Sequence, residues 1–150
     1  MRTLPTVASL LLAVGLAASA RAQELTEARR IEIARLLQES TVSVISGPSS
    51  GTGFVTGEQR WIVTNSHVIR PAARYGVQVH FASGTMQGAT VLLDDPSRDL
   101  AVLEIRGSVP ARPLPLGDSD QVVVGQNVLA FGSPFGLEGT LTQGIVSARR

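Results

Sequence analysis

The 150-residue sequence contains no cysteine and no lysine, and it has only two histidines, one tryptophan and one tyrosine. Without cysteine no disulfide can form, so the stability of the fold has to come from a packed core. Two histidines without cysteine or an H-E-x-x-H pattern also give no ligand set for a metal ion. We therefore expect no metal and no other cofactor.

The sequence also has no large excess of positive or negative charge. The formal net charge is +1, and the thirteen basic residues, all arginine, are spread along the chain rather than clustered. Proteins that bind nucleic acid usually carry a basic patch or stripe. We therefore do not expect nucleic acid among the partners.

Long apolar runs are also scarce, and the one that stands out is at the N-terminus. Arg2 precedes an uncharged apolar run over residues 7–18, and residues 20–22 have the A-x-A pattern of a cleavage site. The run is shorter than the ~20 residues that span a bilayer, which argues against a membrane anchor. Residues 1–22 therefore predict a secretory signal peptide, with cleavage after Ala20 as an alternative. We expect a periplasmic or secreted bacterial protein that has no membrane segment after cleavage.

A helical pattern follows this segment. Residues 24–38 are rich in good helix formers, and their apolar side chains recur at spacings of three and four. The apolar positions are Ile31, Ile33, Ala34 and Leu37. We assign residues 23–40 to an N-terminal helix and expect it to cover an edge of the β-structure.

From Thr41 onward the pattern changes to short apolar segments separated by glycine, proline or asparagine. Strands are predicted at residues 41–46, 52–56, 60–64, 76–81, 87–93 and 100–105. Their short connections leave no room for the helices that a parallel sheet needs, so an antiparallel barrel or sandwich is favoured. The fold class is all-β.

Three prolines in residues 109–118 predict an extended connector and a domain boundary, because proline cannot donate to a central ladder. Residues 121–132 and 139–149 are predicted as two further strands on either side of a turn at 133–136. A lone two-stranded hairpin is marginal in water and exposes unpaired backbone groups. We expect this unit to pair with further chain beyond Arg150 or with another surface.

His67 is the first candidate for chemistry. It follows the apolar segment at 61–64, and the end of a strand is where a rigid sheet can present catalytic groups. A lone histidine is more often a surface residue or a satisfied core residue. For His80, which lies inside an alternating strand, we keep this non-catalytic interpretation of a surface or satisfied core residue.

Asp99 is the second candidate. It begins the apolar segment at 99–105, and a carboxylate at the start of a buried strand needs a partner. The alternative is that Asp99 caps the preceding turn. Asp94 and Asp95 fill that role more naturally, because they stand beside Pro96.

Six motifs follow one another along the chain, and two of them contain His67 and Asp99. They are S-G-T-G-F-V (50–55), T-N-S-H-V (64–68), R-D-L-A-V-L (98–103), L-G-D-S-D (116–120), V-G-Q-N-V-L-A-F-G-S-P-F-G-L (124–137) and T-Q-G-I-V-S (142–147). Together they resemble the trypsin-like serine proteases of the HtrA (Deg) type, over residues 41–150. The resemblance implies a chymotrypsin-fold antiparallel β-barrel over 41–115 and the start of a second, truncated barrel over 116–150.

The resemblance also implies roles for His67 and Asp99 in a triad ordered His, Asp, Ser. His67 would act as general base towards a serine hydroxyl, and Asp99 would orient the imidazole and stabilise the imidazolium. The family's nucleophile lies in a G-N-S-G-G motif, which these 150 residues do not contain. The segment that forms the family's oxyanion hole is absent as well, and so are the family's PDZ domains. We therefore expect a fragment of a serine endopeptidase that is inactive in the 150-residue form.

Unfolded or misfolded proteins and peptides are the substrates that the resemblance implies once the missing segment is supplied, with a homo-oligomer as a further expectation. A different class of function is a non-catalytic β-barrel that binds partners through the open edge of the second unit. A truncated gene without a working product is a third interpretation. The sequence does not separate it from the fragment.

Two other motifs have simpler explanations. Residues 47–51 fit the G-x-S-x-G pattern with Ser49, but a nucleophile elbow needs a strand-to-helix turn and the order Ser, acid, His. Residues 51–57 fit a dinucleotide fingerprint imperfectly, and turns and bulges explain their glycines. The remaining aromatic residues singled out are assigned to core or turn packing: Phe54, Trp61, Phe131 and Phe135.

Overall fold

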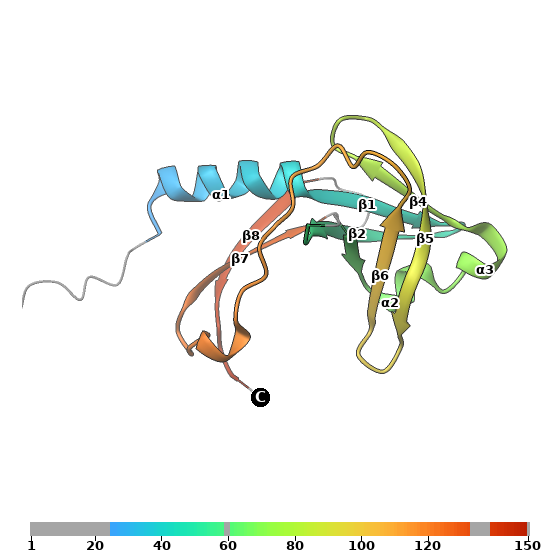
Figure 1. Cartoon of the computed structure of the whole chain (residues 1–150). Coiled ribbons are helices and arrows are strands. Elements are labelled where there is room, and N and C mark those ends of the chain that lie inside the picture. The colour runs from blue at the N-terminus through green and yellow to red at the C-terminus, as the bar shows by residue number, and fades with distance from the viewer. Residues whose placement is uncertain (1–24, 59–60, 133–138, 150) are drawn as a thin grey trace, which may run out of the picture.

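The computed structural model describes residues 25–58, 61–132 and 139–149 (Figure 1). The predicted signal peptide (1–22) and the predicted turn at 133–136 with Phe135 lie outside the described residues. Within the described part of the chain, no helix is long and apolar enough to cross a membrane.

Antiparallel strands form a closed barrel between residues 41 and 105. They are β1 (Thr41–Ser46), β2 (Ser49–Thr56), β3 (Trp61–Thr64), β4 (Val77–Phe81), β5 (Met86–Asp95) and β6 (Leu100–Ile105). Their order around the barrel is β1-β2-β3-β6-β5-β4, and pairing of β4 with β1 closes it. Closure removes the free edges of the sheet. The predicted all-β class is confirmed, as a barrel rather than a sandwich.

The barrel interior follows the alternation of the strands. Every second residue of β1, β3, β4 and β6 is buried, and most of these positions carry an aliphatic side chain. The largest fully buried aliphatic residues are Ile62, Leu103, Val44, Val55, Val68 and Val79. A core of this kind takes the place of the disulfides that the sequence cannot form.

The glycines of β2 correct one expectation. A Cβ on Gly51 would lie 2.5 Å from Cγ2 of Val68, and a Cβ on Gly53 would lie 2.9 Å from Cγ2 of Ile62. Both glycines lie inside the strand, where side chains of neighbouring elements occupy the space of a Cβ. Only Gly57, with φ of +72°, belongs to a turn as expected.

Trp61 is a second correction, because its side chain is 40% exposed rather than packed in the core. It is the first residue of β3 and has the opposite orientation to Ile62, which points into the barrel. Phe54 and Phe131 are half-buried.

The N-terminal helix α1 (Glu27–Ser40) begins after Thr26, whose Oγ1 accepts a hydrogen bond from the N–H of Arg29 at 3.2 Å. The helix runs directly into β1. It extends away from the barrel (Figure 1), and only Ser40 is buried. The expectation that it covers a barrel edge is wrong, because the β1–β4 pairing leaves no open edge there.

The predicted connector is extended and docks on the barrel. The N–H of Leu114 donates to the carbonyl of Val55 at 2.8 Å, and Oγ1 of Thr56 donates to the carbonyl of Leu114 at 2.7 Å. The boundary between residues 115 and 116 stays a prediction.

A two-stranded antiparallel sheet follows, made of β7 (Asn127–Gly132) and β8 (Thr140–Ile145). The first half of the predicted strand at 121–132 is wrong. Gln121 ends a 3₁₀ turn, η1 (Ser119–Gln121), residues 122–126 are not in a strand, and β7 begins only at Asn127. The side chain of Asp118 caps that turn by accepting from the N–H of Asp120 at 2.9 Å.

Candidate active site

The side chain of His67 is presented by a short helix that packs on one end of the barrel. This helix, α2 (Ser66–Ile69), follows β3 after Asn65, and a second short helix, α3 (Ala72–Tyr75), comes next. Val68 and Ile69 are buried in the core, which fixes α2, while His67 faces outward with 56% of its side chain exposed.

Asp99 lies in the turn that leads from β5 to β6, at the same end of the barrel as α2 (Figure 1). Its φ of +52° is the one positive value among the non-glycine residues that the structure describes. Aspartate tolerates this left-handed conformation better than most residues, and such backbone outliers cluster at functional sites.

The cap of this turn is Asp95, not Asp99. Oδ1 of Asp95 accepts hydrogen bonds from the N–H of Ser97 at 3.0 Å and of Arg98 at 3.2 Å. Nη1 of Arg98 also donates to Oδ2 of Asp95 at 2.7 Å. The carboxylate of Asp99 is therefore not used by the turn and is directed elsewhere.

Three contacts join Asp99 to His67. Nδ1 of His67 lies 2.8 Å from Oδ2 and 3.0 Å from Oδ1 of Asp99, and the backbone N–H of His67 donates to Oδ1 at 2.9 Å. A carboxylate can only accept, so the ring proton is held at Nδ1. Nε2 is then the nitrogen that carries a free lone pair, as a general base requires.

The carboxylate of Asp99 titrates below its ordinary value. Hydrogen bonds from the backbone N–H and then the side chain of His67 are the main causes that lower its pKa from 3.8. Desolvation opposes them in part, and the electrostatic effects of His67 and Arg70 lower the pKa a little further. Asp99 is therefore ionised at neutral pH, as the contact with Nδ1 requires.

This lowered pKa predicts a pH window for the contact. A carboxylate with a depressed pKa stabilises the fold above its unfolded pKa and loses that effect as the pH falls through its folded pKa. We expect the Asp99–His67 contact to be intact above about pH 4 and to be lost in more acidic solution. A carbon-13 titration of the Asp99 carboxyl should give a midpoint below 3.8. An unshifted midpoint would contradict the geometry, and Asp95, whose pKa is lowered by Ser97 and Arg98, provides an internal comparison.

Neither Ser49, the candidate of the G-x-S-x-G pattern, nor Ser66 supplies a nucleophile here. Ser49 is the first residue of β2 and pairs with Ser46 across an antiparallel hairpin, so it does not lie on a strand-to-helix elbow. Oγ of Ser66, the neighbour of His67, is buried and has no hydrogen-bond partner among the described residues. Its burial keeps it from attacking a substrate.

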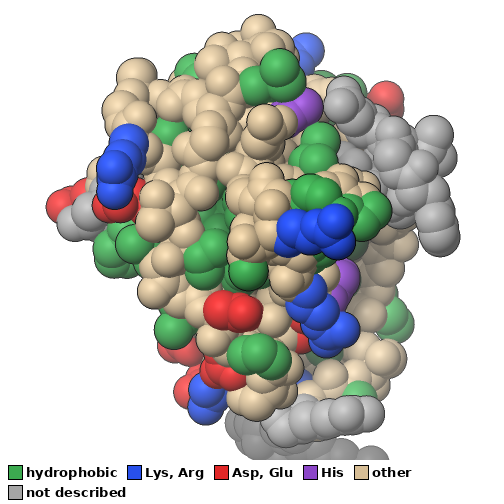
Figure 2. All heavy atoms as spheres, turned by 90° about the vertical axis from the view of Figure 1, so that its right-hand side faces the viewer, with side chains coloured by type: hydrophobic (Ala, Val, Ile, Leu, Met, Phe, Trp, Pro, Cys, Tyr) green, Lys and Arg blue, Asp and Glu red, His purple; other side chains and the backbone are tan. Residues whose placement is uncertain are grey.

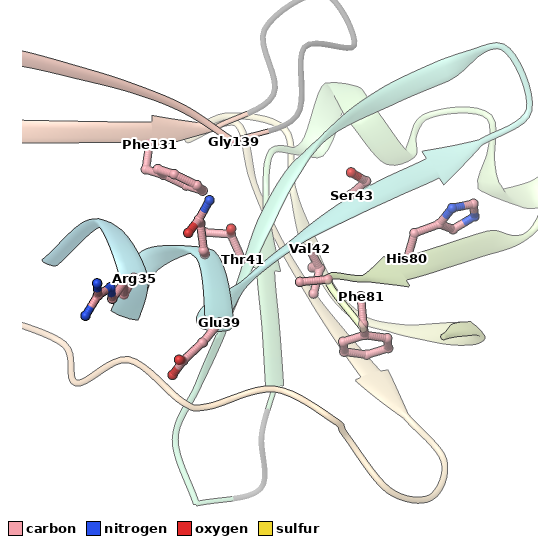
Figure 3. A pocket seen from close by; sticks show the side chains of 11 residues that line it. Arg35, Glu39, Thr41, Val42, Ser43, His80, Phe81, Phe131 and Gly139 are labelled. Atoms are coloured by element: carbon pink, nitrogen blue, oxygen red, sulfur yellow. The ribbon is translucent and has the colours of Figure 1, made fainter. Parts of the chain in front are cut away.

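One hollow in the described part of the chain has the N-terminal helix on its rim and does not include His67 or Asp99. It has a volume of about 510 Å³ and lies between the end of α1, β1, β4 and the β7–β8 sheet. Figure 3 shows Arg35, Glu39 and His80 pointing in three different directions around it. Because its polar groups do not converge, this cavity does not have the character of a catalytic site.

Positively and negatively charged side chains are interspersed on the face of the molecule shown in Figure 2.

Among the described residues, no group of three or more His, Asp and Glu side chains is placed to hold a metal ion.

Comparison with known protein families gives the class of protein. Residues 51–150 match the model of the trypsin-like peptidase domain. This match covers both the His67 and the Asp99 segments and most of the barrel. The chain therefore belongs to the trypsin-like peptidase family.

Individual relatives narrow the class to the HtrA serine proteases. The chain is 45% identical over 112 residues to Protease Do-like 1, chloroplastic, of Arabidopsis thaliana, which covers 73% of the chain and 25% of that protein. It is 46% identical over 100 residues to Serine protease HTRA2, mitochondrial, of Bos taurus, covering 67% of the chain and 21% of the relative.

A third relative is bacterial. The chain is 44% identical over 104 residues to a probable periplasmic serine endoprotease DegP-like of Brucella suis, covering 67% of the chain and 20% of that protein. The chain thus spans a fifth to a quarter of the length of these relatives. Their names place them in three different compartments.

Two residues of the site were not singled out by their sequence pattern. Asn65 contacts Asp99, and Gly51 accommodates Val68 beneath α2. Asparagine directly before a helix gives a recognisable capping signal. The need for glycine at position 51 depends on a helix that follows it in the chain, and no local pattern reveals that.

Proposed function

We propose that this chain is the N-terminal part of an exported HtrA-type serine endopeptidase in which His67 is the general base and Asp99 its orienting partner. The observation that carries the proposal is the contact of Nδ1 of His67 with both carboxylate oxygens of Asp99 at 2.8 and 3.0 Å. That contact holds the imidazole in the tautomer whose Nε2 can take a proton.

The proposed reaction follows from this geometry. Nε2 of His67 takes the proton of a serine hydroxyl as the serine oxygen attacks the peptide carbonyl, and the imidazolium that forms is stabilised by the ionised Asp99. His67 then returns the proton to the leaving amine, which completes acylation. Water repeats the same proton path to release the acyl group.

The serine itself is proposed to lie in a G-N-S-G-G segment beyond Arg150. The β7–β8 sheet supports this, because two strands alone are marginal and these expose apolar side chains, among them Val128 and Ile145. Further strands would pair with the sheet and cover those residues. We call a polypeptide that includes this segment the serine-bearing form.

Unfolded proteins are the proposed substrates, and the periplasm or exterior the proposed location. The first rests on the family to which the chain belongs, and the second on the signal-peptide pattern of residues 1–22 and on the periplasmic name of the bacterial relative. Self-association into a homo-oligomer is part of the same proposal.

Reading the coding sequence past the codon for Arg150 tests the proposal first. We expect an open frame that encodes G-N-S-G-G, and we expect its product to digest unfolded casein while the 150-residue chain does not. A stop codon directly after Arg150 in a sound assembly, or an inert serine-bearing form, would refute the endopeptidase.

The second candidate, a non-catalytic binding protein, is favoured by the exposure of apolar residues on and before the β7–β8 sheet. Val123, Val124 and Ile145 are each more than half exposed. Size-exclusion chromatography of residues 23–150 separates the two. A stable species of defined size supports the binding protein, and aggregation supports a sheet that requires more chain.

A further inference from the structure

Asn65 stands at the position that usually caps a helix, yet it does not cap α2. It is the residue before Ser66, with extended backbone angles, and its side chain makes no capping hydrogen bond. Asparagine at this position normally accepts from a backbone N–H of the first turn. Here the backbone N–H of His67 donates to the carboxylate of Asp99 instead.

The side chain of Asn65 reaches the same residue. Its Nδ2 donates to the backbone carbonyl of Asp99 at 3.1 Å and lies 3.3 Å from Oδ2 of the same residue. One amide group thus contacts both the main chain and the side chain of Asp99. It joins the β3–α2 connection to the β5–β6 turn across 34 residues of sequence.

Asp99 is the residue in this region whose conformation most needs support. Its backbone is left-handed, and its side chain is 45% exposed, so packing alone does not fix it. The contacts from His67 hold the two carboxylate oxygens. The contact from Asn65 to the carbonyl restrains the backbone from which that carboxylate projects.

We propose that Asn65 is a positioning residue that holds Asp99 in the orientation in which its carboxylate binds Nδ1 of His67. The inference rests on the proposed function, in which that contact prepares Nε2 as the base. Asn65 touches neither the substrate nor the reacting atoms, so its effect on the reaction is exerted through Asp99.

Three variants separate this role from a general effect on folding. They are made in residues 23–150 or, if that chain aggregates, in the serine-bearing form. Asn65→Asp keeps the shape but replaces the donor by an acceptor that faces the Asp99 carbonyl, Asn65→Ala removes the group, and Asn65→Ser retains a shorter donor. Asn127→Asp is the matched control, because it places the same charge on an exposed residue at the start of β7.

The readout is the exchange of the Nδ1–H proton of His67 in nitrogen-15-labelled protein. This proton reports on the contact between His67 and Asp99, which we call the dyad, and it can be observed without proteolytic activity. We expect Asn65→Asp and Asn65→Ala to speed exchange of this proton with water by about tenfold, and Asn65→Ser to fall between them and the wild type. Asn127→Asp should leave the exchange rate unchanged. Melting temperature and the amide spectrum of the barrel report whether each variant folds.

The proposal is overturned if folded Asn65→Asp and Asn65→Ala both exchange at the wild-type rate. It is also overturned if none of the Asn65 variants folds, because Asn65 would then support the barrel rather than the dyad. If Asn65→Asp alone fails to fold, the rate in Asn65→Ala decides. A failure of the proposed endopeptidase would leave these rates unaffected and would appear only as an inert serine-bearing form, so the two failures are distinguishable.

Discussion

Replacing Asp99 with asparagine should lower kcat of the serine-bearing form about 10⁴-fold while leaving the fold intact. An asparagine at this position can turn its amide towards Nδ1 of His67, which then becomes the acceptor and moves the ring proton to Nε2. A protonated Nε2 cannot take the proton of a serine hydroxyl. Steady-state hydrolysis of a peptide substrate measures the loss.

Asp95→Asn is the matched control, since Asp95 lies in the same turn and also carries several hydrogen bonds. It should reduce turn stability without a comparable loss of kcat. A loss in Asp99→Asn of less than tenfold, or an equal loss in both variants, would contradict the role that we assign to Asp99.

Gly51→Ala should destabilise the chain by about 1–3 kcal/mol, the usual cost of overpacking a core. The new Cβ would lie 2.5 Å from Cγ2 of Val68, and Val68 is only 2% exposed. Val68 cannot yield without moving α2, and α2 carries His67. Urea unfolding monitored by circular dichroism gives the change in free energy of unfolding.

Gly88→Ala is the control for the Gly51 variant. Gly88 also lies within a strand, β5, but a Cβ there meets nothing within 4 Å. We expect little change in stability from Gly88→Ala. Equal unfolding free energies for the two variants would show that the Gly51–Val68 contact does not constrain α2.

Together these variants link the barrel to the dyad. β2 accepts α2 because it has glycine where Val68 packs, and β6 is entered through a left-handed aspartate that faces α2. The contact between His67 and Asp99 therefore depends on two connections that are distant in sequence, the β3–α2 connection and the β5–β6 turn. Both meet at one end of the same closed barrel (Figure 1).

The barrel could be predicted from the sequence because strand alternation is a local signal. Val42 and Val44 in β1, and Ala101, Leu103 and Ile105 in β6, recur with a period of two and are all buried. The strand and helix boundaries are less local. α1 ends at Ser40, as the assignment to 23–40 predicted, but it begins only at Glu27, because the side chain of Thr26 caps it there.

The error at 121–132 has a different origin. The run of valines at 122–124 has the composition of a strand, yet these residues follow a capped 3₁₀ turn, and Val123 and Val124 are exposed. Composition indicates β-propensity, but pairing requires a partner strand, and the partner β8 pairs only with β7 from Asn127 onward.

For the site, the sequence predicted the pair but not its support. His67 and Asp99 were found through their motifs, and the role of Asp95 in the turn followed from Pro96. The contact from Asn65 to Asp99 could not be predicted, because it depends on the left-handed backbone of Asp99 and on the approach of two distant turns.

The most direct test of the central claim is covalent labelling of the serine-bearing form by a fluorophosphonate, with the labelled residue mapped by mass spectrometry. We expect one labelled serine, in G-N-S-G-G, labelling slowed at least about tenfold by His67→Ala, and no labelling of the 150-residue chain. Labelling at Ser49, or labelling that proceeds equally fast without His67, would contradict the assignment of His67 and Asp99 as the dyad of a serine protease.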